Sequence, residues 1–327
     1  MKPIVIASRG SKLALWQANY VADKLYHMGF QCEVKVISTE GDRVQNRFLH
    51  EFGGKGVFIR ELESALKNGE ADIAVHSLKD LPVNLPEGFF LPAILKRHLP
   101  CDAIIFKESA RGKQSDLPQT LSLDHFAKMG KMTIATSSLR RQALFKSVNP
   151  EIDLVAVRGN VDTRIRKLNE GDWDALILAA ASLERLELNV PHRLIDLEWF
   201  VPCAAQGALA IECRDDYEHA DAIKKMSDAN TNQAACIERL LLKKLGGDCT
   251  MPCGVFVDEF EEKTRARALV ANYEGNICRA YSEYDQKLMS LPREKIMHDL
   301  YEGLVKQGLH KILADISGQE PDLGDVN

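Results

Sequence analysis

The fold is decided by the stretch PIVIASRGSKLALWQANYVADKLYHMGFQCEVKVIST, residues 3–39. It begins with a short apolar run at 3–8, continues through 11–29 with apolar residues at helical spacing, and ends with a strand-like run at 32–39. Gly29 stands where the helix should stop. The stretch therefore predicts a strand, a helix and a second strand, which is the beginning of an α/β unit.

The same alternation of strands and helices continues along the chain. The segment 56–69 predicts a helix, ADIAVHS (71–77) predicts a strand, and a second α/β unit begins after KRHLPCD (96–102). The strands expected in this second unit are DAIIFK, TIATSS (133–138), DLVAVR (153–158) and DALILAA (174–180), with a helix from about Ser138. The polar segment 108–119 predicts a surface loop.

From about residue 230 the pattern changes. A long helix, NQAACIERLLLKKL, is followed by the strand-like runs CGVFVDEF, TRARALVANY and NICRAYSEY and by a closing helix near 293–315. This order predicts a third, α+β domain.

Composition places the chain among cytoplasmic globular proteins. Its 327 residues are 45% hydrophobic, enough for two or three domains. The N-terminus lacks the pattern of a signal peptide, and no apolar run reaches the roughly 20 residues that span a membrane. In the cytoplasm the eight cysteines need no disulfides. The net charge of −5 argues against a nucleic-acid partner, so local arginines must meet any anionic ligand.

Polar and basic residues follow four of the predicted strands. Ligands of open α/β sheets bind outside the carboxyl ends of the strands, so these positions are candidates for a binding site. Taken singly, the serines and asparagine are ordinary helix caps and each arginine is an ordinary surface charge. Arg140 and Arg141, however, oppose the dipole of the helix they begin, and a ligand's carboxylate or phosphate would offset this cost. Neither common phosphate-loop motif occurs at a strand end, and GGKG (53–56) is a candidate flap carrying Lys55.

Asp80 is the one acid among these basic strand ends. It could simply form an ion pair with Lys79 or another neighbour. Alternatively, its carboxylate could act as an acid or base, or stabilise a cation, beside a ligand held by arginines.

Cys249 lies in LGGDCTMPCG (245–254), after two glycines and before a proline. The chain contains no C-x-x-C, which disfavours both a structural zinc site and a thioredoxin-type redox pair, so we expect no metal. A nucleophilic or carrier thiol and a plain surface thiol both remain open.

Eight blocks of sequence, in their order, resemble the signature blocks of the porphobilinogen deaminase (hydroxymethylbilane synthase) family, over nearly the whole chain. They are SRGSKLALWQA, GGKGVFIRELE, DIAVHSLKDLP, ATSSLRRQ, VRGNVDTRIRKL, DALILAAASLERL, AAQGALAIECR and LGGDCTMP. The resemblance implies an α/β fold of two periplasmic-binding-protein-like, doubly wound domains with the active site in the cleft between them, plus a smaller α+β C-terminal domain. The expected domain ranges are 1–95 with 208–224, 100–201, and 225–327.

The resemblance also implies a function and its residues. Four porphobilinogen molecules are joined head to tail with loss of ammonia, and water releases hydroxymethylbilane, a precursor of haem. A dipyrromethane cofactor is held by Cys249 through a thioether, and Asp80 is the catalytic carboxylate. The other implied cofactor-binding residues are Ser77, Lys79, Asp80, Ser138, Arg140, Arg141 and Gly207. The implied substrate-binding residues are Arg9, Ser11, Lys55, Arg158, Arg164 and Arg185.

Two positions depart from the family pattern. Glu51 stands where many relatives carry a lysine, and Ala205 replaces the first glycine of the family's P-x-x-G-Q-G. The competing class is a non-catalytic binding protein with two α/β lobes, which would carry no covalent adduct. As an enzyme, the chain is expected to be a monomer whose partner is the small molecule porphobilinogen, with no nucleic acid and no membrane.

Overall fold

A computed structural model describes residues 2–38, 59–108, 116–247 and 251–318. The chain divides into two compact units. The first comprises Met1–His98 and Gly207–Asn232, and the second comprises Leu99–Gln206 and Gln233–Asn327. Among the described residues, no helix is long and apolar enough to cross a membrane.

The first unit contains one mixed sheet with helices on both faces. The strand order is β2-β1-β3-β11-β4, in which β1 is parallel to β2 and β3, and β11 is antiparallel to both β3 and β4. The strands are β1 (Ile4–Ser8), β2 (Cys32–Val36), β3 (Ile73–Ser77), β4 (Phe89–Ile94) and β11 (Leu209–Arg214). The helices are α1 (Lys12–His27), α3 (Arg60–Lys67) and α8 (Ala220–Lys224).

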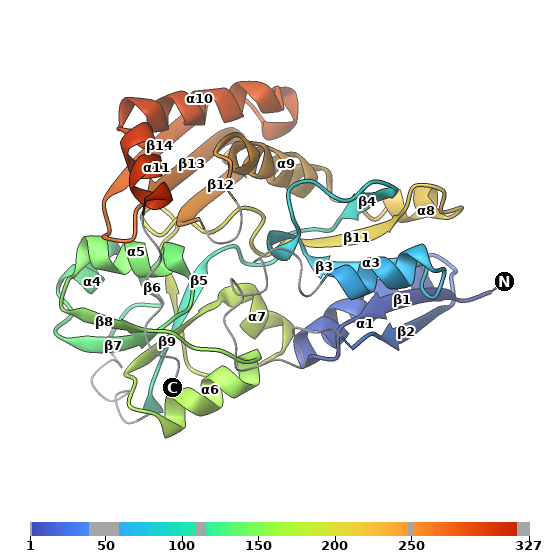
Figure 1. The fold of residues 1–327 in the computed structure, drawn as a ribbon, viewed down its shortest axis with the longest axis horizontal. Helices are drawn as coiled ribbons and strands as arrows, with labels where there is room; N and C mark the ends of the chain where they lie inside the picture. The colour runs from blue at the N-terminus through green and yellow to red at the C-terminus, as the bar shows by residue number, and fades with distance from the viewer. Residues whose placement is uncertain (1, 39–58, 109–115, 248–250, 319–327) are drawn as a thin grey trace. The chain divides into compact units, whose positions relative to one another are not determined.

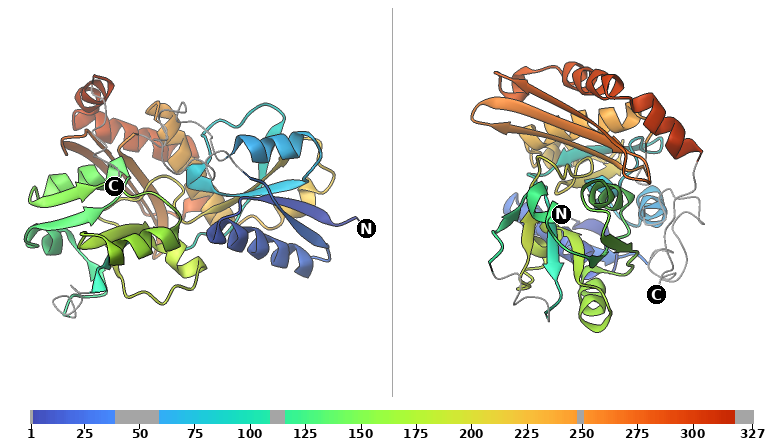
Figure 2. Two further views of the ribbon diagram at one scale, coloured as in Figure 1. Left: turned by 60° about the horizontal axis from the view of Figure 1, so that its bottom comes forward. Right: turned by 90° about the vertical axis from the view of Figure 1, so that its left-hand side faces the viewer.

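Alternation along β1 and β3 decides which helix covers each face of this sheet. Ile6 and Ile73 pack with Val21 of α1, whereas Ala7 and Ala74 pack in another cluster with α3 residues. Successive residues of a strand face opposite sides, so α1 and α3 lie on opposite faces, as Figure 2 shows.

The second unit contains an α/β sheet of the same kind. Its strand order is β6-β10-β5-β9-β7-β8, and β7, β8 and β9 are parallel neighbours. The strands are β5 (Asp102–Phe106), β6 (Thr120–Leu121), β7 (Met132–Ala135), β8 (Ile152–Val155), β9 (Ala175–Ala179) and β10 (Arg193–Ile195). The helices α4 (Leu123–Ala127) and α5 (Leu139–Val148) pack in one core cluster, and α6 (Val161–Glu170) and α7 (Ala180–Arg185) pack in another.

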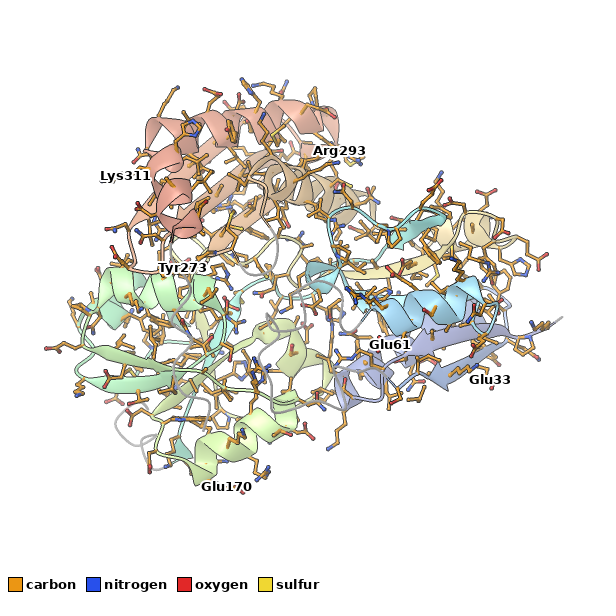
Figure 3. All side chains as sticks on the ribbon, viewed as in Figure 1. Glu33, Glu61, Glu170, Tyr273, Arg293 and Lys311 are labelled. Atoms are coloured by element: carbon orange, nitrogen blue, oxygen red, sulfur yellow. The ribbon has the colours of Figure 1, made fainter. Side chains whose placement is uncertain are left out.

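The same unit also contains a three-stranded antiparallel sheet, β12-β13-β14. Its strands are β12 (Cys253–Phe260), β13 (Lys263–Ala271) and β14 (Ile277–Tyr284). The helices packed on it are α9 (Ala229–Lys244), which belongs to this unit from Gln233 onward, α10 (Arg293–Lys306) and α11 (Leu309–Ser317). These helices cover one face of the sheet (Figure 1). Tyr273, labelled in Figure 3, lies in the turn between β13 and β14, and its carbonyl oxygen accepts a hydrogen bond from Nζ of Lys146 on α5 at 3.1 Å.

The predicted fold class is confirmed: two lobes are α/β sheets with helices on both faces, and the C-terminal part is α+β. One predicted element is wrong. The single closing helix is divided into α10 and α11, because Gly308 has a left-handed backbone with φ 92°. The division into three domains stays a prediction.

Candidate active site

In the first unit, the predicted residues follow β1 and β3, which are parallel neighbours. Their carboxyl ends therefore lie at one edge of the sheet. Ser8 ends β1, and Ser11 caps α1 by accepting a hydrogen bond from the backbone N–H of Ala14 at 3.2 Å. The capping role expected of a serine at this position is thus present, and Arg9 lies between these two serines in the chain.

The end of β3 carries Asp80 on a short, well-anchored turn. Oγ of Ser77 accepts a hydrogen bond from Nε2 of the buried Gln17 at 2.9 Å. Residues Leu78–Asp80 then form one 3-10 turn, in which the buried Leu78 donates its N–H to the carbonyl of Ala208 at 3.0 Å. Asp80 itself is exposed. The turn is therefore fixed from its buried side, while the carboxylate faces solvent.

In the second unit, the predicted residues follow β7, β8 and β9. Ser138 is the N-cap of α5 after β7, Arg158 follows β8, and Arg185 ends α7 after β9. Because these strands are parallel neighbours, their carboxyl ends share one edge of the sheet. Nε of Arg164 donates to the carbonyl of Gly159 at 2.7 Å, which holds this side chain beside the turn after β8.

Arg140 and Arg141 form the best-defined cluster of the site, together with Asp102. Both arginines lie in the first turn of α5, and their residues are only 4% and 7% exposed. Nη2 of Arg140 lies 2.6 Å from Oδ2 of Asp102, and Nη2 of Arg141 lies 2.6 Å from Oδ1. Each Nη1 donates to a backbone carbonyl, that of Val201 at 2.9 Å or that of Ile177 at 3.1 Å. The two guanidinium groups thus share one buried carboxylate.

This cluster contains more positive than negative charge. Burial raises the pKa of Asp102, but Arg140 and Arg141 outweigh burial and hold the pKa well below its usual range, so Asp102 is ionised. Two guanidinium groups and one carboxylate leave one net positive charge among buried groups. Burying an unbalanced charge costs several kcal/mol, so a further anion would stabilise the site.

A second observation points to a ligand. Nε of Arg140 and Nε of Arg141 are buried and have no hydrogen-bond partner among the described residues. Buried donors are normally satisfied. A group with several carboxylates fits both this pair of donors and the excess positive charge.

The segment between the two α/β lobes in the sequence contains further buried polar contacts. Nε2 of Gln206 donates to Oδ1 of Asp102 at 3.1 Å and to the carbonyl of Pro100 at 2.7 Å. Ala205 and Gly207 have left-handed backbones, with φ 62° and 86°. Alanine rarely adopts this conformation, so Ala205 carries a conformational cost that a glycine would avoid. Oε2 of Glu238 accepts the N–H of Ala205 at 2.6 Å.

Sequence reasoning missed Asp102 and Gln206. In the structure the carboxylate of Asp102 meets Arg140 and Arg141, so the unfavourable helix dipole alone does not require a ligand. The evidence for a ligand is instead the net positive charge of the cluster and the two Nε atoms without a partner among the described residues. The local signal for Asp102 was weak, since a charged residue at the start of a strand is usually exposed. Cys249, Lys55 and Glu51 lie outside the described residues.

Metal ligation has no support in the described part of the chain, where no three His, Cys, Asp or Glu side chains gather in a way that could hold an ion. That the protein needs no metal stays a prediction.

The fold and these strand ends define an α/β protein whose buried arginine pair offers unpartnered donors and excess positive charge to an anionic ligand. Comparison with known proteins names its family. Residues 4–222 match the family described as "Porphobilinogen deaminase, dipyromethane cofactor binding domain". The chain therefore belongs to the porphobilinogen deaminase family, as the sequence blocks indicate.

Curated relatives agree over most of the chain. Porphobilinogen deaminase of Nitrosomonas europaea is 40% identical over 97% of this chain and 99% of the relative. That of Neisseria meningitidis serogroup A is 38% identical over 91% and 94%, and that of Burkholderia orbicola is 44% identical over 76% and 72%. Among solved structures, a probable amino-acid ABC transporter extracellular-binding protein of Bacillus subtilis is 13% identical with a TM-score of 0.40, covering 75% of this chain and 98% of that one. A likeness at that level carries no argument about function.

Proposed function

We propose roles for individual residues in the activity that belongs to this family. The chain is a transferase of tetrapyrrole biosynthesis: it joins four porphobilinogen molecules head to tail with loss of ammonia, and water then releases hydroxymethylbilane. It carries the dipyrromethane cofactor of the family. The observation that best supports the residue roles is the buried pair Arg140 and Arg141, which shares one carboxylate.

Arg140 and Arg141 bind carboxylates of the cofactor, with Ser138, Ser77, Lys79 and Gly207 as further contacts. The chemistry that dipyrromethane supplies when bound is a nucleophilic pyrrole carbon, and its acidic side chains match the excess positive charge of the arginine pair. Guanidinium forks suit planar carboxylates better than lysine does. Cys249 supplies the sulfur of the covalent attachment.

Asp80 is the catalytic carboxylate. Loss of ammonia from porphobilinogen leaves positive charge on a pyrrole nitrogen, and a fixed negative charge nearby stabilises it. Asp80 suits this role because its turn is anchored through Leu78 and Ser77 while its carboxylate stays accessible. The same carboxylate accepts and returns the protons that move when two pyrroles are joined.

The remaining basic strand ends hold substrate. Each porphobilinogen brings an acetate and a propionate, so every ring added places two more carboxylates in the site. The residues with this role are Arg9, Ser11, Lys55, Arg158, Arg164 and Arg185. Their number explains how a chain with a net charge of −5 binds a strongly acidic product.

The protein acts as a cytoplasmic monomer and binds no nucleic acid. Its seven described cysteines are all free, which is typical of a reducing compartment. Its net negative charge opposes binding to a polyanion.

Asp80→Asn tests the assignment of the catalytic carboxylate. The substitution keeps the shape and removes the charge, so the rate of porphobilinogen consumption should fall by about 100-fold or more while circular dichroism stays unchanged. Asp23→Asn, at an exposed aspartate about three turns after Ser11 on α1, is the control and should retain full turnover. Near-normal turnover in Asp80→Asn contradicts the assignment.

A further inference from the structure

Asp102 and Gln206 make a buried hydrogen-bonded network that the roles above leave without a function. Both residues are fully buried. Oδ1 of Asp102 accepts from Arg141 and from Gln206, and Oδ2 accepts from Arg140. Gln206 is itself fixed by the carbonyl of Pro100. Three side chains from two segments, two from the start of α5 and one from Gln206, therefore converge on one carboxylate.

A purely structural role explains this arrangement poorly. A buried ion pair contributes little net stability even when its charges balance. Here the adjacent cations Arg140 and Arg141 share a single anion, Asp102. An arrangement selected for stability alone would need one arginine at most.

The same arrangement is well suited to orienting the two guanidinium groups. Each arginine is held at Nη2 by Asp102 and at Nη1 by a backbone carbonyl, so neither guanidinium group can turn without breaking two bonds. These contacts use two of the five N–H donors of each guanidinium group, and Nε of each arginine is buried and without a partner among the residues that the structure describes. The protein contacts thus fix the plane of each guanidinium group and leave its Nε donor available.

We propose that Asp102, fixed by Gln206, is a positioning residue that holds Arg140 and Arg141 in place for the carboxylates of the dipyrromethane cofactor. The inference rests on the proposed role of the arginine pair. In this proposal Asp102 and Gln206 do not contact the ligand, and they act only through the two arginines. Preorganised donors bind their ligand without first losing conformational freedom, so loosening them lowers the yield of loaded enzyme.

The test compares Asp102→Asn and Gln206→Ala with a matched control. Asp174→Asn is that control: it is also an aspartate of the second unit, and its Oδ2 accepts the N–H of Thr133 at 2.7 Å next to β9. Each full-length protein is purified in the same way and denatured, and mass spectrometry gives the fraction that carries the covalent adduct. Thermal unfolding of each variant is measured alongside.

We expect the fraction of adduct-bearing protein to fall about 10-fold or more in Asp102→Asn and by a smaller factor in Gln206→Ala. Asp174→Asn should load as the wild type does, even where its thermal stability falls by as much. If Asp102→Asn does not fold, the adduct fraction of Gln206→Ala tests the inference by itself, because this variant leaves both arginine–aspartate contacts in place. Full loading of Gln206→Ala and Asp102→Asn, or equal losses in the control, overturns the inference.

Arg141→Gln separates this inference from the proposed function. If Arg141→Gln loads poorly while Asp102→Asn loads fully, the arginine binds the cofactor and Asp102 does not position it. If Arg141→Gln loads fully, the cofactor-binding role of the pair is wrong, and the inference falls with it.

Discussion

Glu238→Gln offers a sharp test of how the segment before Gly207 is held. Glu238 is fully buried, and its two carboxylate oxygens accept different backbone groups: the N–H of Ala205 at 2.6 Å and the N–H of Val257 at 3.0 Å. Glutamine has one acceptor oxygen in place of two, so its NH₂ group must face one of these donors. One charge-assisted hydrogen bond is lost and one buried N–H is left unsatisfied, which together cost about 2–3 kcal/mol of unfolding free energy.

The assay is urea unfolding followed by circular dichroism for the wild type and the variant. Glu218→Gln is the control, since the Glu218 side chain is 82% exposed and should change the unfolding free energy by less than about 0.5 kcal/mol. Because Ala205 adjoins Gln206 and Gly207, the variant should also carry less adduct. A loss in Glu238→Gln no larger than that of the control refutes the reasoning that Glu238 anchors both segments.

Three further predictions follow from the second unit and from buried thiols. Because folding lowers the pKa of Asp102, the contribution of its carboxylate to stability is complete above the unfolded pKa of about 3.9 and is lost as the pH falls toward the folded pKa. Below pH 4 the unfolding free energy of the wild type should therefore fall more steeply with decreasing pH than that of Asp102→Asn. Parallel curves for the two proteins would contradict this prediction. Burial, reinforced by nearby acids, raises the pKa of Cys101 and of Cys213 to about 12. Iodoacetamide at pH 8 should therefore modify both thiols only after unfolding, as peptide mapping by mass spectrometry can show, and rapid labelling of either one in the native protein would show its burial to be wrong. Replacing Arg158 by glutamine should stall elongation and enrich enzyme carrying partly extended chains, as native mass spectra can show; an unchanged distribution of intermediates would count against its substrate role.

Most helices and strands could be predicted because each is encoded by the spacing of its own apolar residues and by the residues at its ends. The strand 3–8 and the helix that follows it appear as β1 and α1, and Gly29 has the left-handed backbone of a helix stop, with φ 91°. The break at Gly308 was also encoded locally, but glycine within a helical pattern can be tolerated, so the pattern alone did not separate one helix from two.

Features that depend on contacts distant in the sequence could not be predicted from local pattern. β11 pairs with both β3 and β4, which lie more than a hundred residues earlier, and nothing in its own sequence specifies either partner. Asp102 likewise meets Arg140 and Arg141 only because β5 and the start of α5 come together in the fold. The arginines were predictable from their place after a strand, whereas the carboxylate that holds them was not.

The most direct test of the central claim is the mass of the denatured protein. A chain that builds its product on a cofactor attached to Cys249 should exceed its sequence mass by two linked pyrrole rings. Cys249→Ala should have the mass of its sequence and no turnover, while Cys253→Ala, whose thiol is buried in β12, should keep the adduct. A denatured wild-type protein with no mass excess, or an adduct that persists in Cys249→Ala, would contradict the account.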